Sequence, residues 1–139
     1  MASKGSAAVL ARKMIRHEIF GDSNDPFVQK LVAFLAILRE KYDERLRSAN
    51  DLNELCIALN IVLSDDEDDG GITWGRVLMA YMYLGRTAKE QYQTMQSEEA
   101  FDREFVTPAC DHLGNLVDGW VNARPNGWDG LMDRIASEV

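Results

Sequence analysis

With 139 residues, the chain is long enough for one domain with a sizeable core and too short for two, so we expect a single domain over residues 1–139. Hydrophobic residues make up 46% of the chain and charged residues 27%, and these globular values exclude disorder as its main state. The net charge of -8 argues against nucleic-acid binding, because phosphate recognition needs a basic surface. An acidic surface favours basic partners.

Periodicity of 3.6 residues recurs throughout the chain, and no alternating segment of useful length is present, so the sequence predicts an all-α protein. A first helix is expected over residues 5–20, with Gly21 as its stop. Asp25 is placed to cap a second helix that has Pro26 at its first position. The apolar stripe of this second helix consists of Phe27, Leu31, Phe34, Leu35, Leu38, Tyr42 and Leu46.

A shorter helix is predicted over residues 51–63, followed by an acidic turn at residues 64–71. Thr73 can cap the next helix, which begins at Trp74 and continues past Gly85 to about residue 96. Ser97, followed by two glutamates, marks another helix start. Pro108 lies inside the helix that follows Ser97 and predicts either a kink or a restart there. A last short helix is expected to end near residue 137.

Residues 71–85 are almost wholly apolar and contain one arginine, Arg76, near their start. A helix that is apolar on every side belongs in the centre of a bundle, and burying a guanidinium there is costly unless an anion meets it. The anion is supplied either by this chain, through Asp43 or the acidic turn, or by a partner.

The sequence offers no enzymatic motif. Its two histidines, His17 and His112, are far apart in the chain, with no serine elbow, phosphate-binding glycine loop or His/Cys cluster beside them. Cys56 and Cys110 lie among apolar residues at helical spacing, as buried small hydrophobes do in a reducing cytosol. We therefore expect no catalysis, no metal and no cofactor.

A calcium loop is the alternative reading of the acidic turn. Asp65, Glu67, Asp69 and Gly70 fall at positions one, three, five and six of an EF-hand loop. The twelfth position, which requires a bidentate glutamate, is Arg76, and this cation would repel the ion. A solvated acidic loop is the favoured interpretation.

No apolar run reaches the ~20 residues that a membrane-spanning helix needs, and the N-terminus lacks the apolar core of a signal peptide. The chain also ends without an apolar tail that could act as an anchor. A cytoplasmic location without a membrane span is therefore expected.

Two tryptophan motifs resemble those of the Bcl-2 family. Thr73-Trp74-Gly75-Arg76 with its apolar run resembles the first homology motif, Asn-Trp-Gly-Arg before an apolar helix. Residues 120–129, which begin with Trp120 and end with Gly127-Trp128-Asp129, resemble the second motif, a tryptophan followed by Gly-Gly-Trp-Asp. Residues 38–44 are similar to the degenerate third motif, and the first helix takes the place of the fourth.

The resemblance implies a Bcl-2-like helical bundle with a central apolar helix and a surface groove that binds BH3 helices. Tyr42 stands where the third motif has glycine, so this helix would be a poor ligand for another groove, which argues against a killing role. The chain lacks the long loop after the first helix and the anchoring tail. Compact, tail-less members of this kind resemble the pro-survival homologues of large DNA viruses.

In the family, the groove accepts an amphipathic BH3 helix of a pro-death protein through four apolar anchors and one aspartate. The resemblance assigns Arg76 to that aspartate, and Thr73, in place of the usual asparagine, to a weakened polar contact. The expected apolar lining consists of Phe34, Leu35, Leu38, Leu55, Leu59, Leu78, Met79 and Tyr83. The expected structural residues are Trp74, Trp120 and Trp128, with Gly75 and Gly127 allowing close backbone packing.

The function implied is inhibition of apoptosis by sequestering BH3-only proteins, with a promiscuous Bim-like ligand expected first and executioners of the Bax/Bak type as further candidates. The host-cell cytoplasm is then the expected location, with peripheral attachment at mitochondria through partners. An uncovered apolar groove also favours a homodimer. Two alternatives remain: a Bcl-2-fold interaction module in inflammatory signalling with a closed groove, and a calcium-responsive helical module.

Overall fold

The computed structural model describes residues 7–21, 25–42, 51–63, 72–95, 97–124 and 127–138. Helices account for almost all of these residues, and no strand is present among them, so the all-α prediction is confirmed. The elements are α1 (Ala7–Phe20), α2 (Pro26–Tyr42), α3 (Leu52–Val62), α4 (Trp74–Met95), α5 (Glu98–Phe101), the π-helical η2 (Asp102–Val106), α6 (Thr107–Asn122) and α7 (Asp129–Glu138). Asp43, Leu46, the acidic turn and the side chain of Tyr42 lie outside the described residues.

Helix ends follow the local signals of the sequence. Gly21 adopts φ +67° directly after α1, a conformation that glycine takes at little cost. Side-chain caps are made by Asp25 to Phe27 N–H (2.9 Å), Asp51 to Glu54 N–H (2.8 Å), Thr73 to Arg76 N–H (3.2 Å) and Ser97 to Ala100 N–H (3.2 Å). The predicted starts of α2, α3, α4 and α5 are therefore confirmed.

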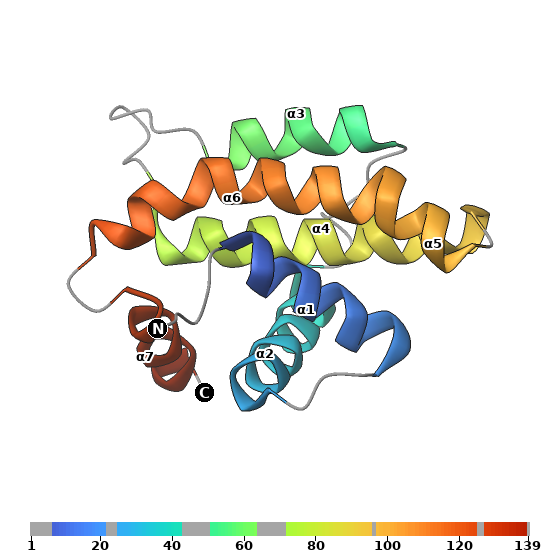
Figure 1. Ribbon diagram of the computed structural model, residues 1–139. Helices are drawn as coiled ribbons and strands as arrows, with labels where there is room; N and C mark the ends of the chain where they lie inside the picture. The colour runs from blue at the N-terminus through green and yellow to red at the C-terminus, as the bar shows by residue number, and fades with distance from the viewer. Residues whose placement is uncertain are drawn as a thin grey trace.

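The central element is α4, which contacts α1, α2, α3, α5, η2 and α6. In Figure 1, α3, α4 and α6 run side by side, α1 passes obliquely in front of α4, and α2 and α7 lie below. Within the described part of the chain, no helix combines the length and apolar character needed to cross a bilayer. The predicted helix at residues 74–96 is thus the core of the bundle, as its composition required.

The most extensive contact between the described helices joins α1 to α6. A Cβ on Gly114 of α6 would lie 3.2 Å from the Cβ of Ala8, so glycine permits this approach. The N–H of Ala7 donates to Asp118 Oδ1 at 2.7 Å, and the buried hydroxyl of Tyr81 donates to the carbonyl of Ala7 at 2.9 Å. The first turn of α1 is thereby fixed to both α4 and α6.

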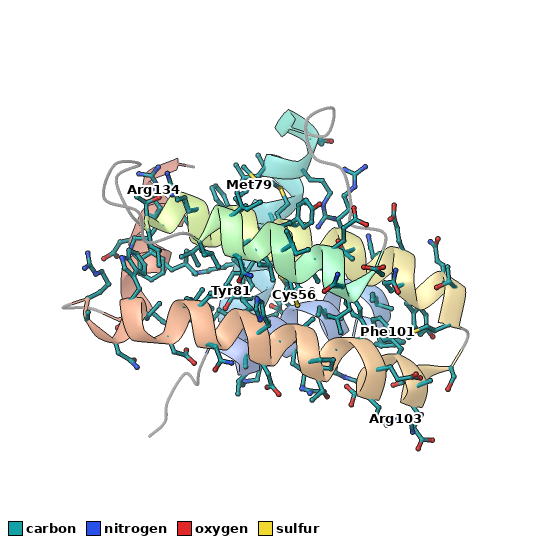
Figure 2. All side chains as sticks on the ribbon, turned by 90° about the horizontal axis from the view of Figure 1, so that it is seen from above. Cys56, Met79, Tyr81, Phe101, Arg103 and Arg134 are labelled. Carbon is teal, nitrogen blue, oxygen red and sulfur yellow. The ribbon has the colours of Figure 1, made fainter. Side chains whose placement is uncertain are left out.

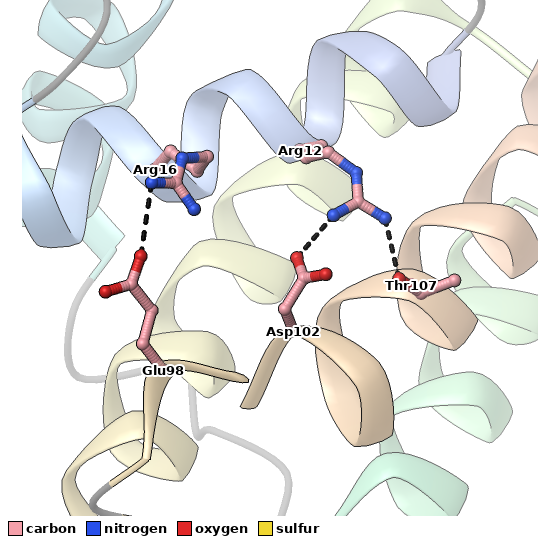
Figure 3. Close-up of polar contacts among 5 residues, drawn as sticks. All are labelled: Arg12, Arg16, Glu98, Asp102 and Thr107. Atoms are coloured by element: carbon pink, nitrogen blue, oxygen red, sulfur yellow. Dashed lines mark hydrogen bonds and ion pairs between the residues drawn. The ribbon is translucent and has the colours of Figure 1, made fainter. Parts of the chain in front are cut away.

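Pro108 is the second residue of α6, so the α-helix restarts here, which is one of the two predicted outcomes. The five π-helical residues of η2 precede it, and the N–H of Thr107 pairs with the carbonyl of Asp102, five residues earlier. Because proline has no N–H for the α-helical ladder, a shift of hydrogen-bond register just before it lets the chain continue without a break. Arg12 of α1 donates to Asp102 Oδ1 and to Thr107 Oγ1 (2.7 Å), so it spans η2, and Arg16 pairs with Glu98 at 3.2 Å (Figure 3).

A buried ion pair joins α1, α2 and α4. Arg39 of α2 donates to Glu18 Oε1 of α1 at 3.0 Å, and the side chains are 21% and 5% exposed. Both lie against Gly85 of α4, where an added Cβ would overlap Glu18 Oε2. Within the described part of the chain, Glu18 Oε2 and Arg39 Nε have no hydrogen-bond partner, so the bond from Arg39 to Glu18 Oε1 is what compensates the burial of these charges.

Candidate functional site

One stripe of α4 is only half covered by the rest of the bundle. Arg76, Met79 and Tyr83 are half-buried, whereas most other residues between Val77 and Ala88 are fully buried. Their spacing of three and four residues places them on one side of the helix. Figure 2 shows Met79 on the side of α3 that faces α2, and Tyr81 on the opposite side, toward α6. We call Arg76, Met79 and Tyr83 the α4 stripe.

Arg76 lies in the first turn of α4, where the cap on Thr73 fixes its backbone. Its side chain is half-buried, so the burial cost that the sequence implied is partial. Asp43 and the acidic turn, the intramolecular anions considered for it, lie outside the described residues. The assignment of Arg76 to a ligand aspartate stays a prediction.

Helix α3 brings a charged group near the stripe. Burial raises the pKa of Tyr83, and the carboxylate of Glu54 on α3 raises it further, so the hydroxyl of Tyr83 lies within the field of that carboxylate. Leu38 of α2 is half-buried and packs against the core.

Five of the expected lining residues are core residues in this structure. Phe34, Leu35, Leu55, Leu59 and Leu78 are each at most 5% exposed and belong to the main hydrophobic cluster. A ligand can touch them only after α2 or α3 moves away from α4. Leu38, Met79 and Tyr83 are the members of the predicted set that the structure leaves partly accessible.

Two charged residues near this surface were not predicted from the sequence. Arg86 is half-buried and follows Tyr83 by three residues, so helical periodicity alone extends the stripe to it. Glu54 lies on the exposed part of α3, and its relation to Tyr83 depends on how α3 packs on α4. Only the first of these could be found by counting residues.

The three tryptophans gather at the N-terminal end of α4. The ring of Trp74 meets that of Trp120 edge-on at 4.8 Å and that of Trp128 at 5.9 Å, both between ring centroids. Gly130 permits this packing, because a Cβ there would lie 3.1 Å from Trp74 Nε1. The two tryptophan motifs, far apart in sequence, thus form one cluster.

Gly75 and Gly127 do not serve the close backbone packing expected of them. A Cβ on Gly75 would meet only Thr73 Oγ1 at 3.7 Å, an ordinary contact. Gly127 has open space around it and adopts φ +52°, so its conformation, not its size, requires glycine. Close approach occurs instead at Gly85, Gly114 and Gly130.

Groups that could carry chemistry are sparse. No cluster of three or more His, Cys, Asp or Glu residues is placed to hold a metal within the described ranges. Cys110 is buried, which raises the pKa of its thiol to about 12, and Cys56 is half-buried. His17 and His112 are both half-buried, and they lie on different helices, α1 and α6.

The chain matches no known protein-family model, and no curated protein is significantly similar to it in sequence.

Proposed function

We propose that the chain inhibits cell death by binding the amphipathic BH3 helix of pro-death proteins between α2 and α3, with the α4 stripe as the floor of the site. The observation that carries the proposal is the contrast on α4. Within residues 77–88 of this helix, Met79 and Tyr83 are the half-buried apolar residues, and Arg76 lies one turn before Met79. An amphipathic helix presents apolar side chains at the same spacing.

Apolar burial and the charged hydrogen bond are expected to contribute differently to binding. An apolar anchor contributes roughly 1.5–3 kcal/mol when fully buried, and a hydrogen bond to a charged group contributes about 1.5–3 kcal/mol. Affinity would therefore come mostly from several anchors, and orientation from Arg76 opposite the ligand aspartate. The role of Arg76 rests on the resemblance of the Trp74-Gly75-Arg76 motif together with its position on the stripe.

Fluorescence polarisation with a labelled BH3 peptide of the Bim type tests the proposal. Arg76→Glu should weaken binding by about tenfold to a hundredfold, the loss expected for a charge-assisted bond. Replacing the peptide aspartate with alanine should cause a similar loss, and the two changes together should cost less than their sum. Peptides from Bax- and Bak-type proteins in the same assay would define the range of partners.

The matched control is Arg103→Glu. Arg103 is exposed on η2 and pairs only loosely with Glu104, at 3.8 Å, so its replacement makes the same change in net charge away from the stripe. Figure 2 shows it at the opposite end of the molecule from Arg134 of α7. Absence of binding at micromolar peptide, or equal losses in both variants, would contradict the proposal.

The second candidate function keeps the bundle and closes the groove. It is favoured by the direct contact of α2 with α4, where Arg39 approaches Gly85. In that case the protein would act through its outer surface, as an interaction module in inflammatory signalling. A folded protein that binds no BH3 peptide at all would support this alternative.

Self-association belongs to the same proposal. Ile57 and Ile61 on the outer side of α3 are 51% and 70% exposed, which adds apolar surface beside the expected groove. We expect sedimentation to detect a dimer at ~100 μM, since interfaces of ordinary size hold well below that concentration. A monomer under those conditions would contradict it.

A further inference from the structure

A second surface feature lies at the tryptophan end of the bundle. It is a pocket of about 500 Å³, formed by backbone and side chains of residues 72–75 together with Trp120, Arg124 and Arg134. These residues come from the start of α4, the end of α6 and the middle of α7. The volume falls within the range of small-molecule sites.

The charge of this pocket is opposite to that of the protein. Among the described residues that line it, the charged side chains are two arginines, Arg124 and Arg134, whereas the whole chain carries a net charge of -8. Both arginines lie on exposed positions. Guanidinium groups present a planar set of donors that matches the oxygens of carboxylates and phosphates.

One of the arginines is held in place by an aromatic ring. The guanidinium carbon of Arg124 lies 4.8 Å from the ring centroid of Trp120, a cation–π contact. The backbone of Arg124 is also fixed, because its N–H donates to Val121 O at 3.0 Å and its carbonyl accepts from Gly127 N–H at 3.3 Å. An arginine stacked in this way loses little freedom when its outer N–H groups bind an anion.

Two indole rings form part of the remaining lining. Trp74 and Trp120 are both half-buried and line the pocket together with Ile72, Thr73 and Gly75. Such indole surfaces favour a flat apolar group. The pocket therefore combines an anion-binding edge with an aromatic wall.

We propose that this pocket binds a small organic anion in which a carboxylate or phosphate, held by Arg124 and Arg134, is attached to a flat ring that lies against Trp74 and Trp120. The site differs from the α4 stripe, because neither arginine belongs to the stripe and Met79 and Tyr83 do not line the pocket. The two sites adjoin at Thr73, which lines the pocket and caps the helix turn that carries Arg76.

The chain carries its own probe for the test. All three of its tryptophans lie in the cluster at this end, and two of them line the pocket, so tryptophan fluorescence reports on this end of the molecule. Phenyl phosphate, benzoate and inorganic phosphate are titrated in turn. We expect saturable changes with phenyl phosphate or benzoate at a Kd of about 1 mM, usual for ligands of this size, and inorganic phosphate to bind about tenfold more weakly.

Three arginine variants separate the site from general charge. Arg124→Gln and Arg134→Gln should each weaken binding of the better ligand by about tenfold, and Arg124→Lys should lose part of that affinity because it keeps the charge without the fork. Arg103→Gln, the matched control, should leave the Kd unchanged. Far-UV circular dichroism and the urea midpoint check that each variant is folded.

The results that would overturn the proposal are equally definite. The first is the absence of saturation by either ring-bearing anion up to ~20 mM, more than an order of magnitude beyond the expected Kd. The second is a Kd for inorganic phosphate equal to that for phenyl phosphate. The third is a loss of affinity in Arg103→Gln equal to the loss in the pocket variants. The head group that binds more tightly, carboxylate or phosphate, identifies the class of ligand.

Discussion

Tyr81 and Tyr83 are two residues apart on α4 and have opposite surroundings. Tyr81 is fully buried between α4, α1 and α6, and its hydroxyl donates to Ala7 O at 2.9 Å. Tyr83 is half-buried on the stripe near Glu54. Burial raises the pKa of both, but that of Tyr81 far more. One side of α4 thus holds the bundle together, and the other is left available for a partner.

The largest expected effect is on the free energy of unfolding when each tyrosine is truncated to alanine. Tyr81→Ala should lower the free energy of unfolding by about 3–5 kcal/mol, because it removes a buried aromatic ring and leaves a cavity. Tyr83→Ala should cost less than about 1.5 kcal/mol and should weaken peptide binding instead. Urea unfolding and fluorescence polarisation on the same preparations measure both. Equal losses of stability would erase the distinction between the faces.

The two glycines of α4 sharpen the comparison with a smaller change. Gly85→Ala places a methyl group against Glu18 of the buried ion pair and should destabilise the protein by about 1–3 kcal/mol, the usual cost of overpacking. Gly75→Ala meets only an ordinary contact and should stabilise the helix by roughly 0.5–1 kcal/mol. Thermal unfolding of both variants gives the sign of each effect. A Gly85→Ala variant that is more stable than the original protein would contradict the tight packing of Glu18 against Gly85.

A pH titration tests the burial of the α6 face. The thiol of Cys110 ionises near pH 9.0 when unfolded and at about 12 when folded, so the unfolded state loses its proton first. Stability is therefore fully present below pH 9 and falls as the pH rises toward 12, by at most about 1.4 kcal/mol per pH unit from this group. Cys110→Ala should flatten the slope of the urea midpoint against pH. An unchanged slope would contradict the assigned burial.

Local signals predicted the helices well, because caps and stops depend on neighbouring residues. Asp25, Thr73 and Ser97 each accept the hydrogen bond that their position in the sequence predicted, and Asp51 accepts one at the start of α3. The apolar length of residues 74–96 likewise predicted a central helix, and α4 occupies that place. These features required no knowledge of the tertiary structure.

Tertiary packing decided what local signals could not. Leu55 and Tyr83 both have apolar side chains at helical spacing, yet one is in the core and the other is half-exposed, since coverage depends on which helix lies opposite. Gly75 and Gly85 differ only in their neighbours. Contacts between whole helices also determine the hydrogen bond from Arg39 to Glu18 and the π-helical segment before Pro108. Local sequence signals therefore did not predict either of them.

Methionine methyl NMR tests the central claim most directly, since Met79 lies on the stripe while Met14 and Met82 are fully buried. Titration of a BH3 peptide into the selectively labelled protein, with signals assigned by single Met→Leu variants, should shift or broaden the Met79 methyl most and that of Met14 of α1 least. A peptide that binds while the Met79 signal stays unchanged would contradict the α4 stripe as the floor of the site.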